Sequence, residues 1–552
     1  MIERPQTLVD GISSSMEESF YLSLIREASE GHVFLGNSSL REHRSDRSIV
    51  TFFPHLPALF MRIFALSLPT ALFLTDLLFP FLTTLFFFLA WRGIFRNDLL
   101  AGGVTLIAIG AWEGGLLNVV NPKMVMTLAA AYSALYFGTQ HPSKLHYALR
   151  GGLLGITLYT YPHYFLLFGS FEVADFLRRL VKRARLQIRD FQELIILSLS
   201  TFIISLPYLF LSGLGGKSAA SLDLWYRQVI PSRLPAHPTL QIALLLTIAL
   251  CFFIFKKKSA EEVKNRIPPE DQILTSLFAG LLVLNQSLLH GLDIMFGLHY
   301  RLPLKMLIWI AVVFAVSRII RKASLYRTPV IVLAAYSLFS IITLSGPLLS
   351  PERNRIAEAF TASDLPKVIM WLNTQEESVV LAPHELSEII PVYTPHYVAW
   401  NGYANYQSVT DAELARRYVL QELVEPQSEV ERDRSYPQVF SVYAGNLAAR
   451  ERTWCQVKSF FRKSKAECSV STPSKIRNQE ALKNLEENLA HLSPELFLTL
   501  LREFHVDVIV AENPLPPIIT RECPEGQSIG AYTIYTCRES LSMMRPIRFS
   551  QV

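Results

Sequence analysis

Long apolar segments between about residue 56 and residue 346 constrain this chain more than any other feature. A helix needs about 20 mainly apolar residues to cross the roughly 30 Å of hydrocarbon in a bilayer. Segments of about this length recur through the region, so the sequence predicts a polytopic α-helical membrane protein with about ten spans. The predicted spans are 69–91, 98–113, 122–138, 146–160, 162–179, 191–212, 238–256, 271–289, 303–320 and 328–346.

Composition supports the membrane class and excludes others. Of the 552 residues, 50% are hydrophobic and 18% are charged, whereas soluble globular proteins average about 25% charged residues. The formal net charge of +5 is small for this length, so the total gives no indication of nucleic-acid binding.

Basic residues gather in three loops between the predicted spans. Because cytoplasmic loops carry an excess of Lys and Arg, we expect these loops to be cytoplasmic. An odd number of predicted spans separates each loop from either end, which predicts that residues 1–55 and 347–552 lie outside the cytoplasm. The basic residues are Arg178, Arg179, Lys182, Arg183, Arg185 and Arg189; Lys256, Lys257, Lys258, Lys264 and Arg266; and Arg318, Arg321, Lys322 and Arg327.

The N-terminal 55 residues must then be translocated, although no apolar signal segment follows Met1. We expect that a transmembrane helix normally precedes Ile2. The alternative is translocation of this polar segment by the span that follows it.

Residues 347–552 have ordinary mixed composition and predict an α/β domain outside the membrane. Short apolar runs predict strands, and amphipathic stretches predict helices. The predicted strands are 378–381, 397–400, 506–510 and 532–535, and the predicted helices are 384–390 and 478–504.

Cysteine placement agrees with an extracytoplasmic domain. Cys455, Cys468, Cys523 and Cys537 lie in it, and Cys251 lies alone in a span. Four cysteines allow three pairings, of which Cys455 to Cys468 and Cys523 to Cys537 is the local one. Unpaired thiols are the alternative, and zinc is less favoured because no CxxC or HxxxH spacing occurs.

Residues 14–31 contain the most informative local pattern. Apolar residues recur at helical spacing and Gly31 is a good stop, so we predict a short amphipathic helix on the outer membrane surface. Glu17 and Glu18 lie at its start. Their simplest role is in capping, since Ser14 with Glu17 and Ser15 with Glu18 both fit the capping-box spacing.

The acidic pair, Tyr21, the run Ile25-Arg26-Glu27 and Gly31 together resemble the first external loop of GT-C glycosyltransferases. This class uses polyprenyl-phosphate-linked sugars and includes protein O-mannosyltransferases and lipid A aminoarabinose transferase. Residues 53–59 also resemble its proline-rich start of the next span. The resemblance covers the first loop and the multi-span layout, although the family's key acid is usually Asp.

The resemblance implies a carboxylate base for sugar transfer. Taking the proton of an acceptor hydroxyl requires a base, and the departing phosphate requires cations. Glu17 or Glu18 is the implied base, and Asp10 is a second candidate whose other interpretation is a turn residue before Gly11. Their oxygens could also hold a divalent ion such as Mg²⁺ or Mn²⁺, but their spacing fits no specific site.

Cations for the phosphate are expected from other external loops. His299, Tyr300, Arg301 and Lys305 are grouped at a span boundary, where ionisable residues indicate a functional site. The alternative is that Arg301 and Lys305 extend to lipid headgroups. Two further candidates for substrate binding are Arg227 and Glu113.

Two acids within a span have a predicted structural role. Glu172 and Asp175 lie close before a basic loop, and we expect them to pair with Arg178 or Arg179.

These inferences predict a membrane glycosyltransferase that moves a sugar from a polyprenyl-phosphate donor to an unidentified acceptor. We expect it in the cytoplasmic, or inner, membrane of a prokaryote, acting on the outer face, with no nucleic-acid partner. Two alternatives are a transporter or flippase and a non-catalytic envelope assembly protein that uses its spans as an anchor.

Overall fold

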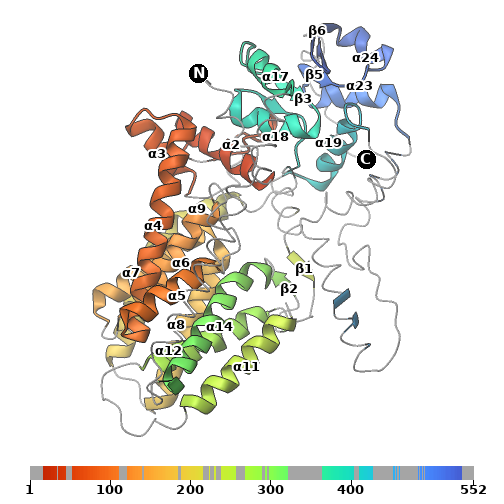
Figure 1. The fold of residues 1–552 in the computed structure, drawn as a ribbon. Helices are drawn as coiled ribbons and strands as arrows, with labels where there is room; N and C mark the ends of the chain where they lie inside the picture. Colours follow the sequence, from red (N-terminus) through yellow and green to blue (C-terminus); the bar gives the residue numbers. More distant parts are fainter. Residues whose placement is uncertain are drawn as a thin grey trace.

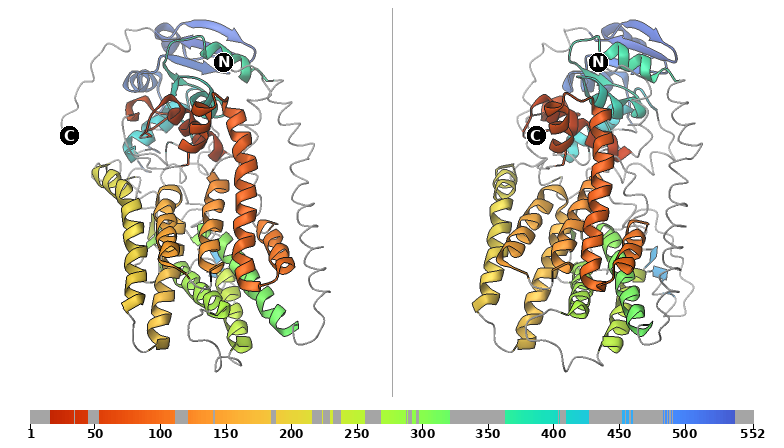
Figure 2. Two further views of the ribbon diagram at one scale, coloured as in Figure 1. Left: turned by 90° about the vertical axis from the view of Figure 1, so that its left-hand side faces the viewer. Right: turned by 60° about the vertical axis from the view of Figure 1, so that its left-hand side comes forward.

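The fold places a helical bundle at one end of the molecule and an α/β domain at the other, with α2 (Met16–Glu30) between them (Figures 1 and 2). The structure is a computed structural model, and most of the described chain is helical. The structure describes residues 16–33, 35–44, 53–110, 121–139, 142–183, 188–215, 223, 229–231, 238–255, 268–286, 288, 292–294, 297–320, 363–402, 404, 409–426, 452–453, 455–456, 459, 483, 485, 487, 489 and 491–537.

The predicted apolar segments form the helices of the bundle. Every predicted segment except 328–346 is occupied by a helix, and 328–346 lies outside the described residues. Helix ends fall within a few residues of the predicted limits. The bundle helices are α4 (Leu68–Phe95), α5 (Asp98–Gly110), α6 (Asn121–Phe137), α7 (Lys144–Thr160), α8 (Pro162–Arg183), α9 (Ile188–Gly215), α11 (Pro238–Phe255), α12 (Pro269–Leu284) and α14 (Gly297–Ile320).

The helices of the bundle differ in how well they suit a membrane. Over the described ranges, two are long and apolar enough to cross one by length and composition: Thr70–Phe95 and Ile188–Phe210. Met124–Phe137 and Leu240–Ile254 are apolar but shorter. α7 has 17 residues, and α8 contains acidic residues and a basic end, so the count of about ten spans stays a prediction.

Close backbone contact and aromatic packing hold the bundle together. A Cβ atom on Gly93 of α4 would lie 2.5 Å from the Cα atom of Gly138, just after α6, so only glycine fits there. Trp91 stacks with Phe87 and lies against Phe137 in the buried core. Large apolar side chains also lie on the outside of α4 and α9. Phe81 and Phe210, for example, are 64% and 65% exposed.

A buried ion pair crosses from α7 to α8. The Arg150 guanidinium contacts both oxygens of Glu172, with Nε 2.8 Å from Oε1, and the Tyr132 hydroxyl donates to the same carboxylate at 2.5 Å. The prediction that Glu172 pairs with Arg178 or Arg179 is therefore wrong. The prediction failed because Glu172 contacts α7 instead, where its basic partner, Arg150, lies inside a predicted apolar span.

The second acid of α8 behaves as predicted. Asp175 accepts from Arg178 at 2.7 Å and from Arg179 at 2.6 Å, one turn further along the helix. Arg178 also contacts Asp271 of α12, and Arg179 contacts Glu193 of α9.

Together with the Arg150–Glu172 pair, these contacts form what we call the basic-end network. It lies where α8 ends, α9 and α12 begin, and α14 ends, the end of the bundle away from the α/β domain (Figure 1). There Arg318 of α14 completes it by pairing with Glu270 of α12.

Helix α2 confirms the predicted helix and its stop at Gly31, where the chain turns with φ +113°. Its apolar face is covered by protein rather than exposed to lipid. Leu24 and Ile25 are fully buried in a core shared with α3 (His55–Ile63), the outer part of α4 and α18 (His384–Tyr393).

The chain after α2 joins the α/β domain. The Ser39 carbonyl accepts from the Val398 amide at 2.8 Å, and Leu40 is buried in the domain core. The 3-10 helix η1 (Arg41–His43) follows. Arg417, which is fully buried, donates to Glu42 of η1, to Glu413 and to the Ala399 carbonyl, each at 2.8 Å.

The C-terminal part is α/β, as predicted, with a five-stranded mixed sheet in the order β4-β3-β5-β7-β6. β3 pairs in parallel with β4 and β5, while β7 is antiparallel to β5 and β6. The strands are β3 (Val379–Leu381), β4 (Tyr397–Val398), β5 (Val508–Ala511), β6 (Glu525–Ile529) and β7 (Tyr532–Thr536).

Helices cover the sheet. The prediction of one helix over 478–504 is wrong at His491–Ser493, because Ser493 caps a new helix that Pro494 begins. The helices, besides α18, are α17 (Leu365–Leu372), α19 (Asp411–Gln421), α23 (Pro494–Glu503) and α24 (Pro517–Glu522).

Disulfide bonding follows the local pairing where it is described. Cys523 and Cys537 are bonded, which joins the end of α24 to the end of β7. Cys455 is disulfide-bonded as well, Cys468 lies outside the described residues, and Cys251 is a buried free thiol.

Candidate functional site

A short β-ribbon brings together two loops that the sequence marked as sources of cations. β1 (Val229–Pro231) pairs antiparallel with β2 (Leu292–Ile294), with Ile230 opposite Asp293. Figure 1 places the ribbon at the end of the bundle that faces the α/β domain. The ribbon therefore joins the part of the chain just before α11 to the part just before α14.

The first turns of α14 contain the most densely grouped candidates. Tyr300 is fully buried, and its ring lies 6.1 Å from that of His163 at the start of α8. Lys305 is half-buried one turn later. Tyr300 therefore fills the core beneath this end of the bundle.

The remaining candidates are placed only in part. Asp10, Arg227 and Glu113 lie outside the described residues. Glu17 and Glu18 lie in the first turn of α2, and His299 and Arg301 lie in the first turns of α14, while their side chains lie outside the described part of the chain. The convergence of these side chains on one site stays a prediction, as does an Mg²⁺ or Mn²⁺ ion held by Glu17, Glu18 and Asp10.

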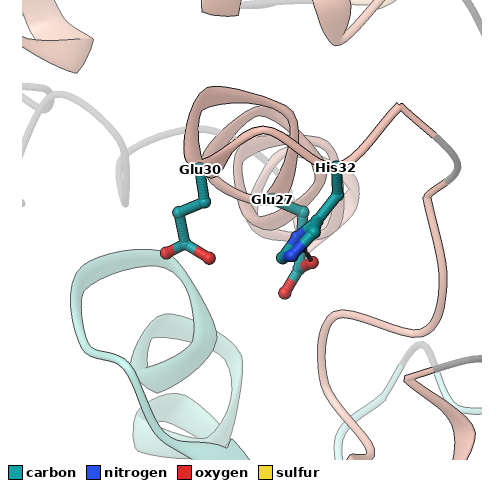
Figure 3. A group of neighbouring side chains, drawn as sticks. All are labelled: Glu27, Glu30 and His32. Carbon is teal, nitrogen blue, oxygen red and sulfur yellow. Dashed lines mark hydrogen bonds and ion pairs between the residues drawn. The ribbon is translucent and has the colours of Figure 1, made fainter.

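A cluster of potential metal ligands occupies the other end of α2, and we call it the α2 cluster. Glu27, Glu30 and His32 each offer one ligand atom, and these atoms lie within 4.8 Å of one another. The His32 Nδ1 atom is 2.7 Å from Glu27 Oε2. Figure 3 shows the imidazole against the Glu27 carboxylate, with the Glu30 carboxylate to one side.

Arg26 connects the α2 cluster to the α/β domain. Its guanidinium lies 3.6 Å from Glu27 and 3.4 Å from Glu30, and it donates to the Thr394 carbonyl at the end of α18. Burial raises the pKa of Tyr397 on β4 to about 12, and the nearby Glu27 carboxylate adds to that rise. The cluster therefore lies where α2 docks on the domain.

A second group of charged residues connects η1, which follows α2, to α19 of the α/β domain. His43 Nε2 lies 2.9 Å from Glu413 Oε1, and Arg417 Nε donates to that oxygen. Burial alone would raise the pKa of Glu413, but the hydrogen bond with His43 and the positive charge of Arg417 outweigh it and lower the pKa to about 2.

Arg26 and Glu27 belong to the motif that resembles a GT-C first loop, but the motif does not predict the α2 cluster. The spacing of the three residues in the sequence was the signal that could have indicated the cluster. Glu27 and Glu30 are three residues apart and so share a helix face, and His32 follows the helix-ending glycine that turns the chain back.

Comparisons with known proteins give a similarity of fold. No protein-family model matches the chain, and no curated protein sequence matches it either. Among solved structures, the chain is similar to ArnT from Cupriavidus metallidurans bound to undecaprenyl phosphate, with a TM-score of 0.43 and 12% identity over 97% of each chain.

Proposed function

We propose that this chain is a GT-C-type membrane glycosyltransferase. It transfers a sugar from a polyprenyl-phosphate donor to an acceptor on the outer face of the membrane. The observation that carries the proposal is the sequence of α2, in which the acidic pair, Tyr21, Ile25-Arg26-Glu27 and Gly31 follow the first-loop pattern of the class.

The surface of the bundle supports a membrane location. Soluble proteins seldom expose large contiguous apolar patches, and such patches mark contact with lipid or another protein. The side chains of Phe73, Phe202 and Phe253 are 60%, 53% and 77% exposed on α4, α9 and α11. These rings suit hydrocarbon rather than water.

The disulfides support the proposed sidedness. Disulfides form and persist outside the reducing cytosol, and the α/β domain contains the Cys523–Cys537 bond. An α/β domain outside the cytoplasm puts α2 on the outer side as well, because the two are packed together. The basic-end network then faces the cytoplasm, as the positive-inside rule requires.

In the proposed reaction, the carboxylate of Glu17 or Glu18 takes the proton of the acceptor hydroxyl as its oxygen attacks the sugar. The bond between the sugar and the phosphate breaks, and the polyprenyl phosphate leaves with both electrons of that bond. His299, Arg301 and Lys305, joined by Arg227, would neutralise the departing phosphate. Tyr300 would hold the start of α14 in place, and Glu113 would face the acceptor.

The test is a sugar-transfer assay on the purified chain with a polyprenyl-phosphate-linked sugar as donor. We expect Glu17→Gln or Glu18→Gln to lower the rate by about 10²-fold to 10⁴-fold, the usual contribution of a general base. Glu495→Gln is the matched control because Glu495 is an exposed acid in the first turn of α23. Unchanged activity in both single variants and in the double variant would remove the proposed base.

A further inference from the structure

At the last turn of α2, one oxygen of a buried carboxylate lacks a hydrogen bond from the described part of the chain. The Glu27 side chain is 3% exposed, yet its Oε1 atom accepts no hydrogen bond from any residue that the structure describes. Arg26, at 3.6 Å and 3.4 Å from Glu27 and Glu30, is beyond ordinary hydrogen-bond length for both. The buried Glu27 Oε1 atom therefore has no hydrogen bond among the described residues, although the other oxygen of this carboxylate contacts His32.

The backbone directs three ligands to one side of the helix end. Glu27 and Glu30 share a face because they are three residues apart. Gly31 adopts a φ that L side chains rarely adopt, and the turn lets the His32 amide approach the Glu27 carbonyl at 3.3 Å. The imidazole returns to the Glu27 carboxylate as a result (Figure 3).

The end of a helix favours a cation, because its last carbonyl groups carry partial negative charge. The last turn of α2 contains no basic residue. Arg62 of α3 approaches this turn, but it donates to the Ser29 carbonyl at 2.9 Å. The helix end therefore attracts cations, and the Arg62 guanidinium already takes up part of that attraction.

We propose that Glu27, Glu30 and His32 bind one divalent transition-metal ion, for which Zn²⁺ is the best candidate. An imidazole nitrogen with carboxylate oxygens suits Zn²⁺, whereas Mg²⁺ and Ca²⁺ prefer oxygen ligands throughout. Glu30 and His32 are 43% and 39% exposed, so the ion can enter from solvent. Three protein ligands leave a coordination position for water.

The proposed ion would act on the joint between bundle and domain. It would replace the contact between Glu27 and His32, bind the Glu27 oxygen that lacks a hydrogen bond among the described residues and fix the turn beside the Arg26 contact with α18. This proposal does not rest on sugar transfer, since none of its ligands is assigned to that reaction.

The experiment is a titration of the full-length chain in detergent with ZnCl₂ after treatment with a chelator, followed by isothermal calorimetry. Elemental analysis of the same sample gives the stoichiometry. We expect one Zn²⁺ bound through the α2 cluster and not displaced by a 100-fold excess of Mg²⁺. His32→Asn and Glu30→Gln should each weaken Zn²⁺ binding by at least about 10-fold. Replacing a residue that only hydrogen-bonds to a metal ligand already lowers affinity by about that factor.

The matched control is His384→Asn. His384 Nε2 lies 3.4 Å from Glu388 Oε1, which makes a second His–Glu pair outside the α2 cluster, so Zn²⁺ affinity should be unchanged. Glu30→Gln distinguishes loss of a metal ligand from misfolding. Because the Glu30 side chain is exposed, the melting temperature of this variant should match that of the wild type. Absence of Zn²⁺ binding by the wild type, or equal weakening in His32→Asn and His384→Asn, would overturn the proposal. No sugar donor is present, so either result leaves the proposed transferase activity to its own assay.

Discussion

The basic-end network and the α2 cluster are both built from buried or half-buried charges, but they differ in how those charges are matched. In the network, Arg150 contacts both oxygens of Glu172, and Asp175 receives two guanidinium groups at 2.7 Å and 2.6 Å. In the α2 cluster, a single guanidinium stands 3.4 Å or more from two carboxylates. The network is thus a set of short Arg–carboxylate pairs, whereas the short contact of the α2 cluster is between Glu27 and the His32 imidazole, at 2.7 Å.

The difference separates structure from candidate function. A buried ion is tolerated when opposite charges and hydrogen bonds satisfy it, which the network achieves by linking α7, α8, α9, α12 and α14. A buried carboxylate oxygen without a hydrogen bond among the described residues, such as Glu27 Oε1, gains by binding a cation. Variants of Glu172 and Glu30 probe the two sides of this contrast, and variants of Leu24 and Glu413 probe how firmly the chain around α2 is fixed to the α/β domain.

The largest effect is expected from Glu172→Gln, which leaves Arg150 buried without its carboxylate. Breaking one partner of a buried ion pair costs about 3 to 5 kcal/mol. We expect a loss of this size in the free energy of unfolding in detergent, measured by denaturant titration. The double variant Arg150→Met, Glu172→Leu removes both charges and should lose much less. Equal losses in the two variants would show that the pair is not a satisfied unit.

The next effect tests the packing of α2. Leu24 is fully buried, so Leu24→Ala removes apolar contact with α3 and α18 and leaves a cavity, at a cost of about 3 kcal/mol. We expect faster hydrogen exchange in α2 and α18 and little change in α7 and α8. Exchange that rises across the bundle instead would contradict a localised joint.

The third prediction concerns pH. The pKa of Glu413 is about 2 in the folded chain, below its unfolded value, so its stabilisation is present above about pH 4.5 and is lost as pH falls towards 2. The loss amounts to about 2 to 3 kcal/mol. Thermal unfolding between pH 5 and pH 2 should show it for the wild type and not for Glu413→Gln. A variant with the same acid dependence as the wild type would assign the effect to other carboxylates.

The smallest effect is expected from Glu30→Gln. Half-exposed ion pairs contribute about 0 to 1 kcal/mol, and the Glu30–Arg26 pair is long at 3.4 Å. The melting temperature should therefore change little, in contrast to Glu172→Gln. A loss comparable with that of Glu172→Gln would make the α2 cluster a structural ion-pair group like the network.

Much of the fold follows from local sequence. Apolar runs predict α4 to α14 closely, because burial and helix length are properties of single segments. The strand β6 (Glu525–Ile529) was missed because it is a polar edge strand with four exposed residues that depends on pairing with β7. The partner of Glu172 was missed for a related reason, since its contact with Arg150 joins two helices.

The candidate site follows from sequence only in part. The first-loop pattern marks Glu17 and Glu18, and boundary charges mark His299 and Arg301, since these are local signals. The pairing of β1 with β2 and the burial of Tyr300 depend on contacts between distant segments. The α2 cluster depends on a single backbone turn at Gly31.

The most direct test of the proposed function is to identify the lipid that binds this chain. Native mass spectrometry of the detergent-solubilised protein with added undecaprenyl phosphate, beside an equal amount of a phosphatidylglycerol, would measure it. We predict one bound undecaprenyl phosphate per chain, weakened when Arg301 and Lys305 are replaced by Gln. Equal retention of both lipids, or binding that is unchanged in that variant, would contradict a polyprenyl-phosphate site at the start of α14.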